Sequence, residues 1–363
     1  MMGILNRYIF KSFSFGLLLA VMLLLSIDVL FNLIKELNDI TAVYTIGDVF
    51  FYVMLTVPSK IYELFPVSVV VAVVVSLGAL ASGSELVVMM ASGVGKLKIA
   101  AVVLLAVLIW LSGVVWMGEF VAPKGDQMAQ QFRNEQISQG KATSVTNAIW
   151  LRDGDVIFRT NQMKAGDTEG SYELTGVTVF ELEDKKLIRV SEADQALYQN
   201  RQWSLLNLKV SVFADDGVQV KTLGQQFWDS RIEPEILNIS TTRPKYLSIR
   251  DISKFQQFND QQRELQSSYR IALWSKFAFP LLVMATALCG VVVLFGQTRS
   301  GGFAQRLVIG IVIGIVVYLI NKTLLNFGEV YHVHPFWVTT MPAMLLIVAL
   351  LLQLSGRMRW LTG

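Results

Sequence analysis

The stretch that decides the fold is IAAVVLLAVLIWLSGVVWMG, residues Ile99–Gly118, which contains no charged side chain. A helix of about 20 apolar residues spans the roughly 30 Å hydrocarbon core of a bilayer, where backbone groups find hydrogen-bond partners only within the helix. Across the 363 residues of the chain, 53% are hydrophobic and 16% are charged. This composition predicts a membrane protein.

Five further apolar runs have a similar length. We therefore expect six transmembrane helices, at Phe13–Ile34, Leu64–Ala81, Ile99–Gly118, Phe277–Gly296, Leu307–Phe327 and Pro335–Leu354. The residues before the second run, from Val49 to Val57, are also apolar, so that helix is expected to be long. The first run follows Arg7 and Lys11 and has no A-x-A cleavage site, which favours a retained span over a removed signal peptide.

The longest polar part of the chain, residues 123–270, holds 19 of the 31 basic and 20 of the 28 acidic side chains. Segments rich in β-branched and aromatic residues predict strands, and Asp215-Asp216-Gly217 predicts a hairpin turn. The predicted strands are 156–159, 177–180, 187–190, 203–212 and 218–220. We expect a β domain of the sandwich or jelly-roll type, followed after Tyr246 by a helix that leads into the fourth span.

The expected fold class is an α-helical membrane protein with three spans, an inserted β domain and three more spans. The predicted parts are residues 1–122, 123–270 and 271–363. Basic residues beside spans favour the cytoplasmic side, and alternating helices gather most of them on one side. These residues are Arg7, Lys11, Lys96, Lys98, Arg299, Arg306, Arg357 and Arg359. The β domain is therefore expected outside the cytoplasm.

Candidate reactive groups are few. His332 and His334 form an H-x-H pair without a third ligand, which is weak support for zinc. Gly93-Val94-Gly95-Lys96 lacks the spacing of a phosphate-binding loop, and Leu97 stands where Ser or Thr is needed. A net charge of +3 is too small to favour a nucleic-acid surface. We expect no catalytic residue, no metal, no cofactor bound by this chain and no nucleic-acid partner.

Asp28 is the acidic residue placed deepest in a predicted span, with Ser26 and Asn32 nearby. Intramembrane carboxylates either relay protons in gradient-driven carriers or form hydrogen bonds inside the helix bundle. We favour the second role, and the two three-span halves show no obvious inverted repeat. Active transport by this chain needs either an ion gradient or a separate ATPase.

The connection between the second and third spans reads Ser84-Glu85-Leu86-Val87-Val88-Met89-Met90-Ala91-Ser92-Gly93. Ser84 is expected to cap a short helix, Glu85 to favour its positive N-terminus and Gly93 to end it. Such a helix either lies on the membrane surface or docks into a groove of a partner protein. The apolar residues that it is expected to expose are Leu86, Val87, Met89 and Met90.

Segment 84–93 resembles the coupling segment of the LptF/LptG lipopolysaccharide export permeases. Three more stretches are similar to this family: Leu5-Asn6-Arg7-Tyr8-Ile9, Trp274-Ser275-Lys276, and Gly118-Glu119-Phe120-Val121-Ala122-Pro123 followed by Gln127-Met128-Ala129. The resemblance covers the whole chain, and segment 84–93 is its most specific part.

The resemblance implies a permease subunit, not itself an enzyme, of an ATP-driven exporter in the inner membrane of a Gram-negative bacterium. The β domain is then a β-jellyroll in the periplasm. The implied partners are an LptF-type permease, two copies of an LptB-type ATPase that bind ATP and Mg²⁺, an LptC-type single-span protein, and lipopolysaccharide.

The resemblance also implies roles for individual residues. Those expected to contact the ATPase are Glu85, Leu86, Met89, Met90 and Gly93. Lipid contacts are expected at the outer end of the first span, where this chain has Lys35 and Glu36, and Lys322 is a further basic candidate.

Two other classes of function stay open. A gradient-driven secondary transporter predicts ion-dependent uptake without any cytosolic ATPase. A membrane-anchored envelope scaffold predicts that the β domain binds a partner while no lipid enters between the spans.

Overall fold

The structure, a computed structural model, describes residues 3–354 except 42, 141–147, 166–170, 185, 200–201, 215–216, 229, 231, 259–262 and 297–302. The chain forms two compact units. One comprises Met1–Arg133 and Ser267–Gly363, and the other comprises Asn134–Gln266. The division falls at different residues from the predicted 123 and 270, because helix α5 (Ala122–Gly140) directly follows the third span and its first turns belong to the helical unit.

The helical unit contains one apolar helix for each predicted span. These helices are α1 (Ile4–Leu37), α2 (Ile46–Ser82), α4 (Lys96–Phe120), α8 (Arg263–Gly296), α9 (Phe303–Tyr331) and α10 (Pro335–Leu354). Within the described residues, all but α10 are long and apolar enough to cross a membrane, and α10 is a shorter apolar helix. The predicted helical fold class is confirmed.

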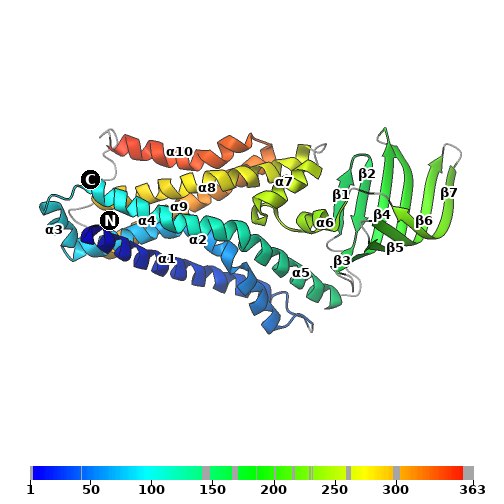
Figure 1. Ribbon diagram of the computed structural model, residues 1–363, viewed down its shortest axis with the longest axis horizontal. Coiled ribbons are helices and arrows are strands. Elements are labelled where there is room, and N and C mark those ends of the chain that lie inside the picture. Colours follow the sequence, from blue (N-terminus) through cyan, green and yellow to red (C-terminus); the bar gives the residue numbers. More distant parts are fainter. Residues whose placement is uncertain are drawn as a thin grey trace. The chain divides into compact units, whose positions relative to one another are not determined.

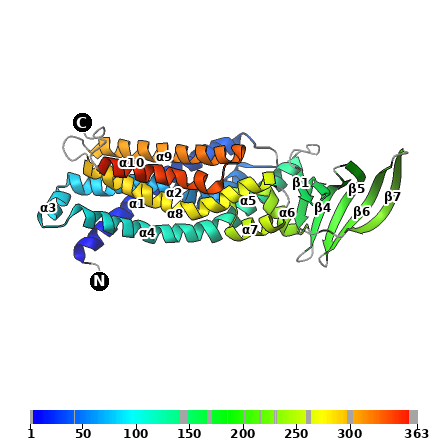
Figure 2. The same ribbon diagram turned by 90° about the horizontal axis from the view of Figure 1, so that it is seen from above.

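Helix α2 forms the centre of the helical unit. Its residues Phe65–Val74 are all buried, and α1, α4 and α9 pack along it (Figures 1 and 2). Glycines let α9 come close: a Cβ atom added to Gly314 would lie 2.7 Å from Cγ1 of Val67, and one added to Gly310 would lie 3.0 Å from Cγ2 of Val74. Small residues at such contacts increase the van der Waals packing that holds apolar helices together in lipid.

The end of α4 meets α2 and α8 at Gly118. The ring of Tyr62 covers this glycine and stacks on the ring of Phe279, with the two ring centroids 4.0 Å apart. A Cβ atom at Gly118 would lie 2.3 Å from Cδ2 of Tyr62. Three helices can therefore meet here because position 118 carries no side chain.

We expect Gly118→Leu to lower the free energy of unfolding by about 2 to 3 kcal/mol, because the stacked Tyr62 ring has little room to move aside. Denaturation of the purified protein in detergent measures this loss. The control is Gly113→Leu in the same helix, where an added Cβ meets nothing within 4 Å. Equal losses in the two variants would show that the tight packing at Gly118 is not the cause.

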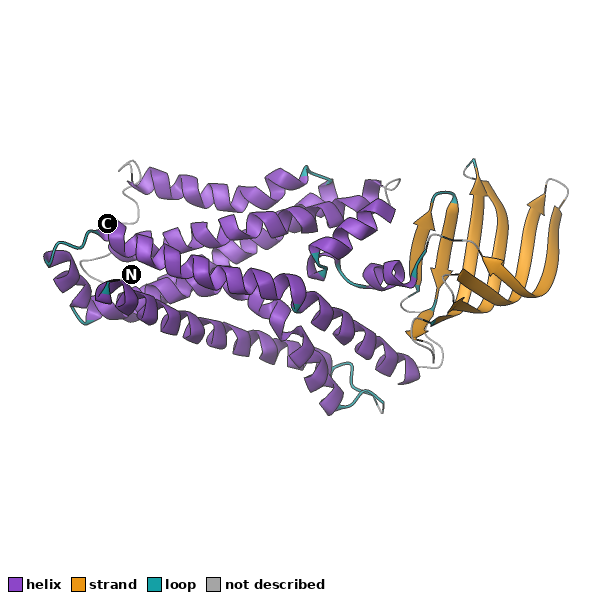
Figure 3. Cartoon of the chain, in the orientation of Figure 1, coloured by secondary structure: helices purple, strands orange, loops and turns teal. Residues whose placement is uncertain are grey.

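The other unit is built on one antiparallel sheet. Its described strands are β1 (Ile149–Asp153), β2 (Val156–Thr160), β3 (Gln162–Ala165), β4 (Tyr172–Glu183), β5 (Lys186–Gln199), β6 (Gln202–Ala214) and β7 (Gly217–Trp228). Their order is β1-β2-β4-β5-β6-β7, and β3 also pairs with β4 (strands labelled in Figure 1 and coloured orange in Figure 3). Sequence neighbours therefore mostly pair with each other, as in a meander.

The inserted β domain is confirmed, and each predicted strand lies in one of β2, β4, β5, β6 and β7. The described strands form one continuous sheet, whereas a sandwich has two. Residues 215 and 216 of the predicted hairpin turn lie outside the described residues, but Ala214 and Gly217 pair across the turn.

Short helices follow the sheet: α6 (Pro234–Thr241), the 3₁₀ turn η1 (Pro244–Tyr246) and α7 (Ile249–Phe258). Helix α6 packs on β1 and α7. The indole of Trp203, 1% exposed, donates a hydrogen bond of 2.7 Å to the carbonyl of Ile232 just before α6. The helix expected after Tyr246 is present as α7, and α8 continues into the fourth span.

Candidate functional site

Helix α3 (Glu85–Ala91) forms from the segment between the second and third spans. Its end is as expected: the N–H groups of Gly93 and Val94 donate to the carbonyls of Met90 and Met89, and Gly93 has the positive φ of 91° that favours glycine. It also starts after Ser84, as predicted. The expected capping by the serine side chain is wrong, because Ser84 has a φ of 60° and its side chain makes no capping hydrogen bond.

The exposed face of α3 also differs from the prediction. Leu86 and Met89 are 3% and 8% exposed and belong to the core of the helical unit, whereas Val87 and Val88 are 58% and 65% exposed. Residues three apart lie on one face of a helix, so burial of Leu86 and Met89 turns the residues between them outward. Met90 is half-buried against the same core. The outward surface consists of Glu85, Val87, Val88 and Ala91, so the predicted exposure is confirmed for Val87 and wrong for Leu86 and Met89.

Glu85 is exposed, and its carboxylate is held by a residue near the start of the chain. The hydroxyl of Tyr8 in α1 donates a hydrogen bond of 2.7 Å to Oε2 of Glu85. The two residues are 77 positions apart, so no local sequence pattern could reveal this contact. Tyr8 lies in the stretch Leu5–Ile9, which the family resemblance singles out without assigning it a role.

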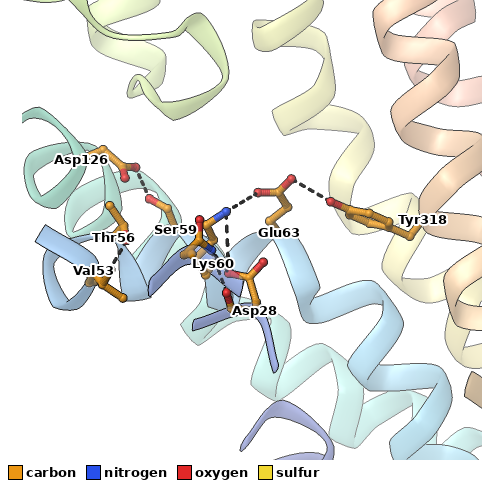
Figure 4. Close-up of polar contacts among 9 residues, drawn as sticks. Asp28, Val53, Thr56, Ser59, Lys60, Glu63, Asp126 and Tyr318 are labelled. Carbon is orange, nitrogen blue, oxygen red and sulfur yellow. Dashed lines mark hydrogen bonds and ion pairs between the residues drawn. The ribbon is translucent and has the colours of Figure 1, made fainter. Parts of the chain in front are cut away.

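A second polar cluster joins α1, α2 and α9 farther along the bundle (Figure 4). Nζ of Lys60 lies 3.8 Å from Oδ2 of Asp28 and 3.9 Å from Oε2 of Glu63. The hydroxyl of Tyr318 donates to Oε1 of Glu63 at 3.2 Å, and the amide of Asn32 donates to Oδ2 of Asp28 at 2.7 Å. Asp28 thus has partners within the bundle, as the favoured interpretation of this residue required.

This cluster aligns the helices that carry two of the candidate lipid contacts. Both α1 and α9 run antiparallel to α2, and Asp28 and Tyr318 meet the same turn of α2. Lys35 lies seven residues beyond Asp28, or about 10 Å, and Lys322 lies four residues beyond Tyr318, or about 6 Å. Both lysines are exposed and lie toward the same end of the unit.

Glu36, the third candidate, is turned away from solvent. It is 6% exposed, and its Oε2 lies 2.9 Å from Nε of Arg133 in α5, which also contacts Asp39 at 2.5 Å. Tyr44 is buried beside this group. The pKa of its hydroxyl is raised to about 12, mainly by burial and secondly by the nearby carboxylate of Glu36. The hydroxyl therefore stays protonated at physiological pH, while Glu36 ties α1 to α5.

Another ion pair joins two stretches that carry the family resemblance. Nζ of Lys276 in α8 lies 2.8 Å from Oε2 of Glu119 in α4, and the two side chains are only 11% and 20% exposed. Nearby, Asp126 of α5 accepts a short hydrogen bond from Ser59 of α2. Glu119 and Lys276 of these stretches, and Asp126 close to the first of them in sequence, therefore connect helices to one another.

Apart from these polar contacts, α1 and α9 expose many apolar side chains. The exposed side chains include Phe15, Leu19, Met22 and Ile27 in α1 and Val312, Ile315, Leu319 and Ile320 in α9. In the described residues no three His, Cys, Asp or Glu side chains are grouped to hold a metal ion. The arrangement suits a molecule with acyl chains and an anionic head group.

Comparison with known proteins identifies the same family as the sequence motifs. The model of the family "Lipopolysaccharide export system permease LptF/LptG" matches residues 7–355. The lipopolysaccharide export system permease protein LptG of Haemophilus influenzae is 26% identical over 361 residues, covering 98% of this chain and 99% of that protein. The protein of the same name in Escherichia coli is 26% identical over 349 residues, covering 94% and 95%.

Proposed function

Because the chain belongs to the LptF/LptG family of lipopolysaccharide export permeases, we propose that it is the transmembrane permease subunit of an ATP-binding-cassette exporter. It extracts lipopolysaccharide from the inner membrane and passes it to periplasmic β-jellyroll partners. The observation that carries this proposal is the family match over residues 7–355, together with six apolar helices and an inserted β domain.

The apolar surfaces of α1 and α9 give the proposed extraction a physical basis. Each buried CH₂ group of an acyl chain costs about 0.8 kcal/mol to expose to water. A chamber formed with a second, LptF-type permease lowers this cost by offering apolar side chains in place of lipid. Lys35 and Lys322 lie on the helices that carry these surfaces, where ammonium groups can meet phosphates.

The energy comes from outside this chain in our proposal. Two copies of an LptB-type ATPase bind ATP and Mg²⁺ below the membrane and contact the outward face of α3 around Glu85. Leu86 and Met89 anchor α3 in the core of the helical unit, so a push on α3 moves the bundle. An LptC-type single-span protein completes the complex. The β domain lies in the periplasm, as the basic flanks of the spans favour.

Purification from detergent-solubilised membranes tests the proposed assembly. We expect a small protein with a Walker motif and a homologous six-span chain to copurify with this protein. The complex in proteoliposomes should then release lipopolysaccharide to a soluble β-jellyroll acceptor only when ATP is hydrolysed. Ion-driven uptake without the ATPase would favour a secondary transporter, and failure of lipid to crosslink to any span would favour a scaffold.

Charge reversal tests the two candidate lipid contacts. We expect Lys35→Glu combined with Lys322→Glu to lower the rate of lipopolysaccharide release about tenfold, because carboxylates repel phosphate groups and two charge-assisted hydrogen bonds are lost. The matched control is Lys35→Arg with Lys322→Arg, which keeps both positive charges. Unchanged release by the reversed variant would remove both lysines from the lipid path.

A further inference from the structure

The hydrogen bond from Tyr8 to Glu85 is a contact to which neither the fold nor the proposed assembly assigns a role. It joins the first turns of α1 to the first residue of α3 at 2.7 Å, and Tyr8 is 44% exposed. Leu86 and Met89 already hold the backbone of α3 on the core. Packing therefore attaches α3 to the core, while the hydrogen bond fixes where the Glu85 carboxylate points and ties it to α1.

Within the described part of the chain, Tyr8 is the residue whose side chain bonds to Glu85. Ser84 takes a left-handed conformation and makes no side-chain cap at the start of α3. Among the described residues, no Lys or Arg forms an ion pair with Glu85, and Tyr8 is the hydrogen-bond donor to its carboxylate. A Glu side chain on a surface samples several rotamers, and ordering it costs conformational entropy. Tyr8 holds Oε2, and no described residue donates a hydrogen bond to Oε1, so Oε1 can accept from a donor outside the chain.

Tyr8 also links Glu85 to a long helix. Helix α1 is continuous for 34 residues, which corresponds to about 50 Å. Its other half carries Asp28, which contacts Lys60 of α2, and then Lys35. The hydrogen bond from Tyr8 therefore connects Glu85 directly to α1, the helix that carries the candidate lipid contact Lys35.

We propose that Tyr8 is a positioning residue for the coupling of α3: its hydroxyl holds the Glu85 carboxylate ready for a cationic side chain of the cytosolic ATPase and ties that contact to α1. This inference rests on the proposed function. A preoriented carboxylate binds a cation with less loss of side-chain freedom than a mobile one. The hydroxyl therefore favours the state in which the ATPase and α1 move together.

The test uses the complete ATPase-containing complex in proteoliposomes and measures the lipopolysaccharide released per ATP hydrolysed. Tyr8→Phe removes only the hydroxyl, and we expect it to lower this ratio about threefold to tenfold, the range for the loss of an ordinary hydrogen bond. Glu85→Asp keeps the charge but withdraws the carboxylate from Tyr8. Tyr331→Phe, which deletes a hydroxyl with no hydrogen bond to any described residue, should keep the wild-type ratio.

A double-mutant cycle separates positioning from a general structural role. If Tyr8 acts through Glu85, Tyr8→Phe lowers the ratio in the wild-type background and has no further effect in the Glu85→Asp background. A wild-type ratio for Tyr8→Phe overturns the inference, and so does an equal loss in both backgrounds. If the wild-type complex itself releases no lipopolysaccharide on ATP hydrolysis, the proposed function fails instead.

Discussion

Replacing Glu85 by lysine is expected to lower the lipopolysaccharide released per ATP hydrolysed at least tenfold while the complex still assembles. Glu85 is exposed on α3 and accepts a hydrogen bond from Tyr8. A lysine there loses this acceptor and places a positive charge where a cationic partner side chain is expected. Two like charges in contact at an interface are strongly unfavourable, so the ATPase no longer engages α3 in the productive geometry.

The fold should tolerate this change. Leu86 and Met89 anchor α3 and are not altered, and a cation in the first turn of a helix costs only about 0.5 kcal/mol. The measurement is ATP hydrolysis and lipid release in the same proteoliposomes. Asp194→Lys, at an exposed position of β5, is the control for a charge reversal elsewhere and should keep the wild-type ratio. Normal coupling in Glu85→Lys would mean that the ATPase does not use this carboxylate.

Much of the fold could be predicted from periodicity and composition, because the membrane sets strict rules for helices. Runs such as Ile99–Gly118 have no alternative to a spanning helix. Strands such as 203–212 were identified by their β-branched and aromatic residues. The connection of all described strands into one sheet could not be predicted, because pairing depends on contacts between segments that the sequence pattern leaves open.

The short helix α3 shows where local reasoning fails. Gly93 ends it as predicted, because a left-handed residue after a helix strongly favours glycine. Ser84 does not cap it, and the tight turn that follows α2 imposes a left-handed conformation on this serine. Which apolar residues face outward depends on where the bundle lies, so Leu86 and Met89 were placed on the wrong face.

The candidate site depends even more on tertiary structure. Lys60 and Glu63 stand in the sequence just before the apolar run Leu64–Ala81, but their partners Asp28 and Tyr318 come from other helices. Arg133 was counted only as one basic residue of the polar segment, and its pairing with Glu36 spans 97 positions. The sequence shows that charged residues stand next to apolar runs. Which of these residues pair with each other depends on how α1, α2, α5 and α9 pack, so the pairs could not be predicted.

The second large effect is expected from Lys276→Met, which should lower the free energy of unfolding by about 3 to 5 kcal/mol. The ammonium of Lys276 lies 2.8 Å from the Glu119 carboxylate, and both side chains are largely shielded. Removing one partner of a shielded ion pair leaves a charge that has lost both its solvent and its counter-charge. The neighbouring stack of Tyr62 on Phe279 over Gly118 is tight, so the helices cannot easily open to hydrate Glu119.

The double variant Glu119→Gln with Lys276→Met decides whether charge or shape causes the loss. Replacing both partners removes the carboxylate charge that has lost the Lys276 ammonium, so much of the stability should return although the side chain at 276 is still changed. Thermal or denaturant unfolding in detergent measures both variants against the wild type. If the double variant is as unstable as the single one, packing by the lysine stem holds α4 and α8 together. If it recovers, the loss in the single variant comes from the Glu119 charge left without its counter-charge, and the packing of α4 on α8 does not need the lysine stem.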